Sequence, residues 1–361
     1  MKRILKHPII SQSPYYVKGP GSMVGKLPPS LLSKYVLSRV GARDPAVIIG
    51  PSVGEDSAVI DLGDGRVLVT HVDPITGAVE FLGWLAVHIV SNDIAVTGAR
   101  PRWLLSVLYL PENSGAELIS EITAQIDSAA KEVGAMVVGG HSEYTPGLKR
   151  PLISMTAIGI TEKSKFVRTG GARSGDAVLM TKVAAIEGTA ILSTDFRDVL
   201  LSKGVPPDVL ERGSGFIKSV SVVREALALA EAGLATSMHD PTEGGLLGGL
   251  TEIAYASSKT VEVWEDKVPV AKETRIICES LGIDVLRLIS SGVLVATVPK
   301  EKAGDAIELL KSRGIKASII GRVREFTGNL VVLHRSSGAV EKLDDVFVKD
   351  ELVRMWEEYK S

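Results

Sequence analysis

Three aspartates in the first part of the chain stand beside or within apolar segments. Asp56 comes directly before a short apolar segment, Asp73 follows one, and Asp93 lies inside the apolar stretch 89–96. A carboxylate among apolar side chains is costly to bury unless it is paired or bound to a metal. Mg²⁺ takes a few carboxylates together with phosphate oxygens. The three acids together therefore predict a Mg²⁺ site, although each alone could also be a cap, a turn residue or a surface group.

A glycine-rich segment offers candidates for proton transfer. Gly139 and Gly140 follow the apolar run 135–138 and let the backbone approach a ligand closely. His141 could carry a proton, donate a hydrogen bond to a phosphate or form only a structural hydrogen bond. Glu143, two residues further on, could take part in acid–base work with His141. An ordinary glycine turn without a ligand is the alternative interpretation.

A third polar segment precedes a predicted helix that runs through residue 256. Asp240 or Thr242 could cap this helix, and Pro241 suits a helix start. Gly244 and Gly245 complete the segment, and the exposed N–H groups of such a helix start attract anions. The alternative is a capped helix start with no ligand.

Common nucleotide and metal motifs are absent from the sequence. No GxxxxGK[ST] loop occurs, no GxGxxG opens a strand–helix unit, and the 6 dispersed histidines show no HExxH spacing. A phosphate site in this chain therefore needs a different arrangement.

Composition limits the class of protein. The 361 residues include 41 Lys and Arg against 43 Asp and Glu, which gives a net charge of −2 and argues against nucleic-acid binding. No window reaches the ~18 uncharged apolar residues of a membrane-spanning helix, so no membrane partner is predicted. Cys278 is the one cysteine, which excludes an intramolecular disulfide and favours a reducing, cytoplasmic location. Only 3 Asn and 2 Gln occur, which favours a thermophilic source.

Hydrophobic periodicity divides the chain into two α/β segments joined by the glycine-rich stretch 169–175. Strands of the first segment are predicted at 47–50, 57–62, 66–72, 103–110, 135–138 and 152–160, with helices at 80–98 and 116–133. Strands of the second are predicted at 177–181, 293–298, 318–323 and 330–334, with helices near 188–194, 220–232, 245–256, 272–281, 302–312 and 351–359. The domains are predicted as a flexible leader at 1–25, an N-terminal domain at 26–165, a C-terminal domain at 172–340 and a helical tail at 341–361.

Taken in order, the polar segments resemble the AIR synthase-related, or PurM-like, superfamily over roughly residues 26–335. The resemblance rests on GEDSAV at 54–59, THVD at 70–73, SNDIAVTGARP at 91–101, GGHS at 139–142 and HDPTEGGL at 239–246. It implies a two-domain α/β (α+β) protein with a C-terminal α/β sandwich domain. It also implies a homodimer whose N-terminal sheets form a shared β-barrel, with ATP bound in the cleft near that interface.

The resemblance implies roles for the polar residues as well. Mg²⁺ would be held by Asp56, Asp73 and Asp93, and the loop of Gly139, Gly140 and His141 would face the nucleotide. From their residue types we predict His141 and Glu143 as the catalytic residues. The residues implied in nucleotide binding are Asp56, Asp73, Asn92, Asp93, Gly139, Gly140, Asp240, Thr242, Gly244 and Gly245. Members of the superfamily often use ATP to phosphorylate an oxygen atom, mainly by electrostatic clamping of the transferred group.

Within the superfamily the pattern is most similar to the hydrogenase-maturation family HypE. That family carries a carbamoyl group on a C-terminal cysteine, which this sequence lacks, and its substrate-side acids are replaced at 186–188 and 290–292. The GGHS segment is instead similar to selenophosphate synthetases. We therefore predict an ATP- and Mg²⁺-dependent, HypE-like enzyme that activates an oxygen of an unidentified small molecule or partner group. The alternatives are a non-catalytic nucleotide-binding maturation or regulatory protein, which would act with a protein partner, and a thiamine-monophosphate kinase-like phosphotransferase.

Overall fold

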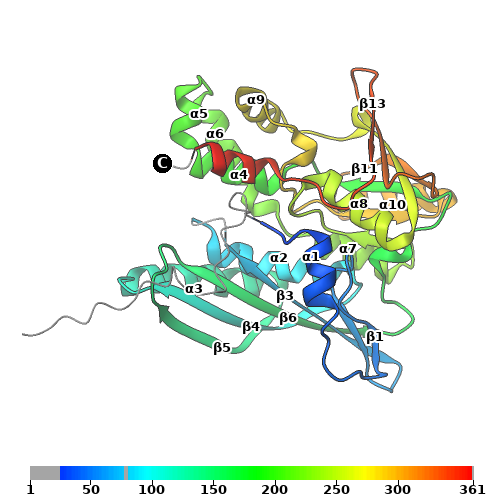
Figure 1. Cartoon of the computed structure of the whole chain (residues 1–361), viewed down its shortest axis with the longest axis horizontal. Coiled ribbons are helices and arrows are strands. Elements are labelled where there is room, and N and C mark those ends of the chain that lie inside the picture. Colours follow the sequence, from blue (N-terminus) through cyan, green and yellow to red (C-terminus); the bar gives the residue numbers. More distant parts are fainter. Residues whose placement is uncertain (1–24, 77–79, 360–361) are drawn as a thin grey trace, which may run out of the picture.

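A computed structural model describes residues 25–76 and 80–359, so the predicted leader lies almost entirely outside the described residues. The described chain forms two sheet-containing domains, one above the other in Figure 1. This mixed α/β architecture confirms the predicted fold class. None of the described helices combines the length and the apolar character needed to cross a lipid bilayer.

The first domain contains a six-stranded sheet in the order β1-β2-β3-β6-β4-β5. Its strands are β1 (Val47–Ile49), β2 (Ala58–Asp61), β3 (Arg66–Ile75), β4 (Arg100–Pro111), β5 (Met136–Thr145) and β6 (Leu152–Glu162). Neighbours pair antiparallel except β4 and β5, which are parallel. The helices α2 (Leu82–Val96) and α3 (Ala116–Val133) lie on one face, and α2 contacts β3, β4 and β6. The alternate burial along β6 fits a sheet covered on one face.

The second domain contains a seven-stranded sheet in the order β13-β12-β9-β11-β7-β10-β8. Its strands are β7 (Ala177–Thr181), β8 (Ser237–His239), β9 (Lys259–Trp264), β10 (Val295–Val298), β11 (Ala317–Glu325), β12 (Val331–His334) and β13 (Val340–Leu343). Its helices are α4 (Ile186–Asp195), α5 (Arg197–Ser202), α6 (Pro207–Ser214), α7 (Val223–Glu231), α8 (Gly245–Ser257), α9 (Lys272–Leu281), α10 (Ala303–Ser312) and α11 (Glu351–Glu358). The shorter helical turns include α1 (Pro29–Leu31), η2 (Leu32–Leu37), η3 (Thr169–Gly171) and η4 (Gly215–Ser219).

Several elements differ from the sequence-based expectation. The segment from residue 139 to 150 was expected to be a loop, but β5 continues through it to Thr145. The reason is register, because residues 139–145 pair one by one with β4, a partner that local sequence does not reveal. The strands β8, β9 and β13 and the helices α5 and α6 were not predicted either, and β13 shows that the predicted helical tail begins with a strand of the second sheet.

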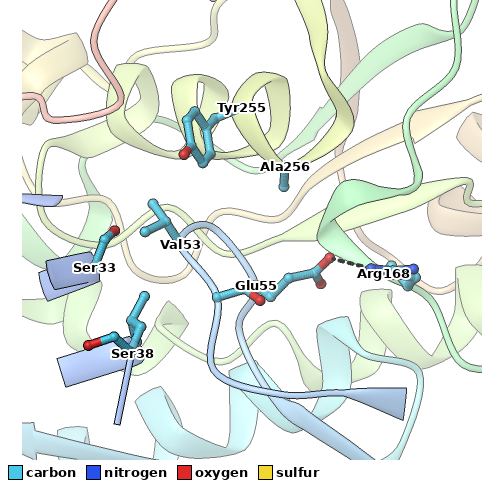
Figure 2. Close-up of a pocket in the computed structure, with 9 residues that line it drawn as sticks. Ser33, Ser38, Val53, Glu55, Arg168, Tyr255 and Ala256 are labelled. Carbon is cyan, nitrogen blue, oxygen red and sulfur yellow. Dashed lines mark hydrogen bonds and ion pairs between the residues drawn. The ribbon is translucent and has the colours of Figure 1, made fainter. Parts of the chain in front are cut away.

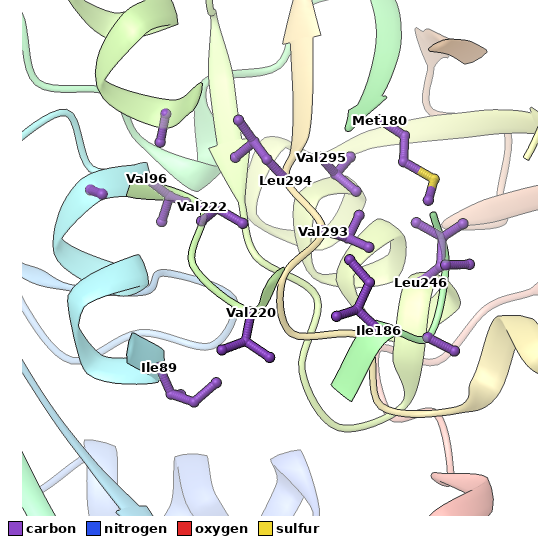
Figure 3. Close-up of a cluster of buried hydrophobic side chains, with 14 of the residues drawn as sticks. Ile89, Val96, Met180, Ile186, Val220, Val222, Leu246, Val293, Leu294 and Val295 are labelled. Carbon is purple, nitrogen blue, oxygen red and sulfur yellow. The ribbon is translucent and has the colours of Figure 1, made fainter. Parts of the chain in front are cut away.

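Helix α2 joins the two domains through an apolar core. It is buried along almost its whole length, and a helix that is apolar on every side must be covered on every side. Its residues Ile89 and Val96 face Val220 and Val222, and these two valines belong to the same apolar core as the residues of the second sheet (Figure 3). The position of α2 between the domains therefore fixes whatever polar residues it carries.

One of these polar residues gives a pH prediction. His88 on α2 is fully buried, and neither ring nitrogen has a hydrogen-bond partner among the described residues. Burial, together with the charge of Lys182, lowers the pKa of His88 from 6.5 to about 4. Between these two values the unfolded chain binds a proton that the native protein does not, so the free energy of unfolding falls as the pH falls. We expect the protonation of His88 alone to lower the free energy of unfolding by about 2–3 kcal/mol between pH 7 and pH 4.5.

Urea unfolding of the wild type and of His88→Phe at both pH values measures this difference. The variant should lose less stability on acidification than the wild type by the stated amount. Parallel pH dependences in the two proteins would contradict the assignment of His88 as a buried neutral ring.

Candidate active site

Three carboxylates from both domains meet at the domain boundary. Single carboxylate oxygens of Asp56, Asp93 and Asp240 all lie within 4.8 Å of one another. Asp56 lies just before β2, Asp93 on α2 and Asp240 just after β8. The structure thus brings together two of the three predicted metal ligands and adds Asp240, whereas Asp73, on β3, stands outside this group. Because the group draws on both domains, it depends on the interdomain packing of α2.

The segment after β8 leaves Asp240 free to face the other acids. Neither Asp240 nor Thr242 caps the following helix, because α8 begins at Gly245 and its N-cap position is Gly244, with no side-chain cap. Gly245 has φ +64°, and a Cβ there would lie 2.6 Å from the carbonyl oxygen of Leu288. The tight backbone turn therefore requires glycine at these positions. The predicted capping role of Asp240 or Thr242 is wrong.

Two members of the acidic group, Asp93 and Asp240, lack hydrogen-bond partners among the described residues for some of their oxygens, although Nε2 of His71 lies 3.7 Å from Oδ2 of Asp93. Asp240 is 1% exposed, and neither of its carboxylate oxygens has a hydrogen-bond partner in the described chain. Oδ2 of Asp93 likewise has no hydrogen-bond partner there. Burial and the neighbouring carboxylates raise the pKa of Asp93 and of Asp240 well above the usual range. Buried carboxylates with free lone pairs either bind protons or bind a cation. Oxygen ligands of this kind suit Mg²⁺, so the residues present fit the predicted ion.

A buried histidine connects this group to a second acid. Nδ1 of His239 lies 2.6 Å from Oδ1 of Asp56, and its Nε2 lies 2.8 Å from Oε2 of Glu252 on α8. Although burial works in the opposite direction, these two carboxylates raise the pKa of His239 well above its usual value. Burial opposes the effect at Glu252 too, but Lys26 and His239 lower its pKa to about 2. Asp56, His239 and Glu252 therefore form a charged chain.

Lys26 is a further member of the site. Its ammonium lies 3.3 Å from Oε1 of Glu252, while its backbone N–H donates to Glu243. Burial alone would lower its pKa, but the carboxylates of Glu252, Glu243 and Asp73 raise it above the usual value. The side chain keeps 48% of its surface exposed, so it can also reach a ligand. Sequence reasoning missed Lys26 because it borders the predicted leader, and missed Glu252 because a helical glutamate carries no signal.

The predicted linker is part of the site rather than a loose connection. The hydroxyl of Thr169 donates to Asp56 over 2.8 Å, and the N–H groups of Thr169 and Gly170 donate to Glu55. Beside them is a pocket of about 430 Å³, lined by Val53, Glu55, Arg168, Tyr255 and neighbouring residues. Figure 2 shows Glu55 reaching Arg168, with Tyr255 on the helix drawn above them. Glu55, which lines this pocket, directly precedes Asp56 of the acidic group in the chain.

The predicted catalytic pair, His141 and Glu143, does not belong to the acidic group of the same chain. His141 and Glu143 lie on the exposed edge strand β5 and contact each other over 3.2 Å. Gly140 shares a cross-strand row with Asp73, but β6 and β4 lie between them, which corresponds to roughly 14 Å. A Cβ on Gly140 would lie 2.0 Å from the carbonyl oxygen of Ser106, so pairing with β4 already requires this glycine. Gly139 lies beside it in β5.

Asn92 has a structural use in addition to its predicted one. Its side-chain amide donates to the carbonyl of Val220 over 2.9 Å, and its side-chain oxygen accepts from the N–H of Val222 over 2.8 Å. Asn92 is fully buried. It therefore holds the segment before α7 to the helix that carries Asp93, and its predicted nucleotide contact stays a prediction.

Both domains match known proteins of one family. The sequence model of the N-terminal domain of AIR synthase-related proteins matches residues 54–161, and that of the C-terminal domain matches residues 173–332. A Methanocaldococcus jannaschii protein, whose name places it among hydrogenase expression/formation proteins, is 31% identical over 82% of this chain and 88% of its own length. The carbamoyl dehydratase HypE of Azotobacter vinelandii is 30% identical over 74% of this chain and 78% of its own length.

A solved structure agrees with the sequence relatives. The crystal structure of the hydrogenase maturation protein HypE in complex with ATP superposes with a TM-score of 0.66 at 26% identity, over 88% of this chain and 93% of that one. The predicted resemblance to this superfamily, with HypE proteins among the relatives, is confirmed. With both domain models matched in order and full-length relatives of similar size, the chain belongs to the AIR synthase-related family.

Proposed function

We propose that this protein is an ATP- and Mg²⁺-dependent enzyme that transfers a phosphoryl group to an oxygen of a small molecule or of a partner's side chain. The observation that carries the proposal is the convergence of Asp56, Asp93 and Asp240 from two domains, in which the buried Asp93 and Asp240 keep carboxylate oxygens without a hydrogen-bond partner among the described residues. A group of this kind is costly to maintain without a cation. The ATP complex of the similar HypE protein supports the choice of nucleotide.

Each residue has a defined task in this proposal. Asp56, Asp93 and Asp240 hold Mg²⁺, which neutralises charge on the nucleotide phosphates when bound. The chain from Asp56 through His239 to Glu252 fixes the orientation of one ligand carboxylate, as groups behind metal ligands commonly do. Lys26 binds a phosphate oxygen, and the pocket beside Glu55 takes the nucleoside. Phosphoryl transfer needs mainly positioning and charge stabilisation, which these residues supply.

The acceptor side carries a candidate for proton transfer. Glu187, at the start of α4, is 5% exposed, and its Oε2 has no hydrogen-bond partner among the described residues. Burial raises the pKa of Glu187 to about 7, with smaller effects from Asp350, Asp73 and Glu243. A carboxyl group with such a pKa can exchange a proton near neutral pH. Glu187 therefore joins His141 and Glu143 as a candidate acid–base group.

Calorimetric titration of the full chain with ATP and Mg²⁺, followed by assays of ADP release, tests the proposal. Carbamoyl compounds, thiamine monophosphate and selenide form the substrate panel. Turnover with thiamine monophosphate alone would favour the kinase alternative, and binding without turnover across the panel would favour the regulatory alternative. Absence of Mg²⁺-dependent ATP binding would reject the proposal. Cys278 is no candidate acceptor, because burial in α9 raises its pKa to about 12.

We also propose the homodimer, on the evidence of strand β5. It is one of the two edge strands of the first sheet, the other being β1, and Met136 and Val138 on it are 68% and 48% exposed. An apolar sheet edge favours pairing with another chain. In such a dimer Gly139, Gly140 and His141 would lie at the interface, which is compatible with a contribution to the partner's cleft.

Val138→Lys is expected to dissociate this dimer, because it places a charge at the centre of the apolar edge. Light scattering should then give a mass near 38.3 kDa in place of twice that value. Val340→Lys is the matched control, since Val340 is 53% exposed on β13, the edge of the other sheet. A wild-type mass of one chain, or equal dissociation by both variants, would contradict the proposed interface.

A further inference from the structure

A second groove lies between the two domains, and it shares no residue with the acidic group. Its volume is about 630 Å³, within the usual range for small-molecule sites. The first domain contributes Arg100 and Glu132, while Lys218, Arg224 and Arg313 belong to the second. No residue proposed to act in phosphoryl transfer lines it, so the groove needs its own explanation.

The groove has more positive than negative charge. Five of its lining side chains are cationic and three are carboxylates, and two of the cations are already paired. Arg100 lies 3.9 Å from Glu231, and Lys182 lies 2.8 Å from the buried Glu225. In the described parts of the chain, no carboxylate lies within ion-pair distance of the remaining three cations, which are Lys218, Arg224 and Arg313. Three unneutralised cations around one groove favour an anionic ligand, and guanidinium groups match phosphate oxygens in pairs.

The floor of the groove is held in place by specific contacts. The ammonium of Lys182 donates to the carbonyls of Ser219 and Ser221 over 3.0 and 2.6 Å. Lys182 has φ +55°, a backbone conformation that is uncommon for a residue other than glycine and persists where the surrounding structure fixes it. Asn92 holds the two residues on either side of Ser221, as described above. The floor is therefore preorganised rather than a loose loop.

Two further observations support a ligand at this floor. Helix α7, nine residues long, begins at Val223 on the groove. The N–H groups of Val222 and Val223 already donate to Asn92 and Ser221, which leaves the next N–H groups of its first turn to favour an anion. Behind the wall lies the fully buried ring of His88, without a hydrogen-bond partner in the described chain, and its Nε2 is 3.9 Å from Glu132 of the groove. An unpartnered buried polar group is costly, so it points to an incomplete polar arrangement at this wall.

We propose that this interdomain groove is a second anion-binding site, which takes the diphosphate group of a small ligand without the help of a metal ion. Lys218, Arg224 and Arg313 bind the phosphate oxygens from the sides, and the start of α7 binds them from the floor. The two sites differ in chemistry. The acidic group repels phosphate unless a divalent cation is present, whereas the groove attracts phosphate through protein cations alone.

This difference provides the test, because EDTA removes the divalent cations that the acidic group needs to bind phosphate. Calorimetry of the full chain in EDTA with pyrophosphate should show saturable binding of one equivalent. Lys218→Glu combined with Arg313→Glu should weaken it at least about tenfold, by a loss of ~1.4 kcal/mol or more. Lys300→Glu combined with Lys302→Glu is the matched control, since both lysines are exposed and lie outside the groove, and it should leave binding unchanged.

A comparison of ligands identifies the source of the diphosphate. ADP that binds tighter than pyrophosphate marks a nucleotide ligand, while equal affinities mark recognition of the diphosphate alone. Crystals soaked with tungstate give a second measurement on the wild type, in which density is expected between Lys218 and Arg313. Absence of saturable binding in EDTA, equal loss in the control variant, or tungstate only elsewhere would overturn the proposal. None of these results depends on Mg²⁺-dependent ATP turnover.

Discussion

Asp93→Asn is expected to reduce Mg²⁺-dependent ATP turnover at least about 100-fold and, in the same protein, to raise stability in the absence of metal. The loss of turnover follows from removing one charged ligand of the proposed ion. The gain in stability follows from the arrangement of the acids, because Asp93 is 7% exposed and stands close to both Asp56 and Asp240. Without a cation these carboxylates repel one another, and an amide in place of one of them relieves the repulsion.

Thermal unfolding with and without ligand makes the two opposite effects visible in one experiment. In EDTA at pH 8 the variant should have a higher unfolding temperature than the wild type, by roughly 2–4 °C for each 1 kcal/mol of stability gained. With Mg²⁺ and ATP the order should reverse, because only the wild type gains binding energy. Asp305→Asn, on the exposed face of α10, controls for the change of charge and should alter neither value. A variant that is less stable in EDTA and equally active would show that Asp93 is a structural acid.

Much of the framework that presents Asp93 could be predicted from periodicity. The helices at 116–133 and 272–281 begin and end as predicted, since each has one apolar face and a glycine directly after it. Helix α2 was predicted as well, and Asp93 and Asn92 were correctly placed on it. These are local patterns of 10–18 residues, which the chain displays without help from distant segments.

The errors arise where distant segments decide the structure. Two adjacent glycines in the sequence suggested a loop at 139–150, yet Gly140 is required by close pairing with Ser106 in β4. Pro241 suggested a helix start, yet the backbone turns at Gly244 and α8 begins only at Gly245. In both places a glycine serves a tertiary contact, and one sequence does not show which backbone approaches it.

The same limit applies to the site. We predicted Asp56 and Asp93 as metal ligands together with Asp73, and Asp240 only as a nucleotide-binding residue, because hydrophobic patterning does not reveal which surfaces of the two domains face each other. His239 lay inside the segment that carried that resemblance and could have been noted there. Its two carboxylate partners are not adjacent in sequence, since one precedes it by more than a hundred residues. The charged chain is therefore a product of domain packing.

His239→Gln tests the charged chain of Asp56, His239 and Glu252. It is expected to lower the free energy of unfolding by about 3–5 kcal/mol. His239 is 5% exposed and lies between Asp56, 8% exposed, and Glu252, 18% exposed. Glutamine can accept or donate a hydrogen bond but brings no charge, so it leaves two poorly solvated carboxylates without their shared cation. Lys26 still pairs with Glu252 and places the expected loss toward the lower end of this range.

His334→Gln is the matched control for this substitution. His334 also contacts a carboxylate, with Nε2 at 3.0 Å from Glu262, but its side chain is 33% exposed and Glu262 has two arginine partners as well. Removing it should cost no more than about 1 kcal/mol, because exposed ion pairs contribute little. Adding Glu252→Gln to His239→Gln should then recover part of the loss, since it removes one of the two stranded charges. Equal losses for His239→Gln and His334→Gln in urea unfolding would mean that the buried imidazolium does not hold the domains' acids together, and the charged chain behind Asp56 would lose its proposed role.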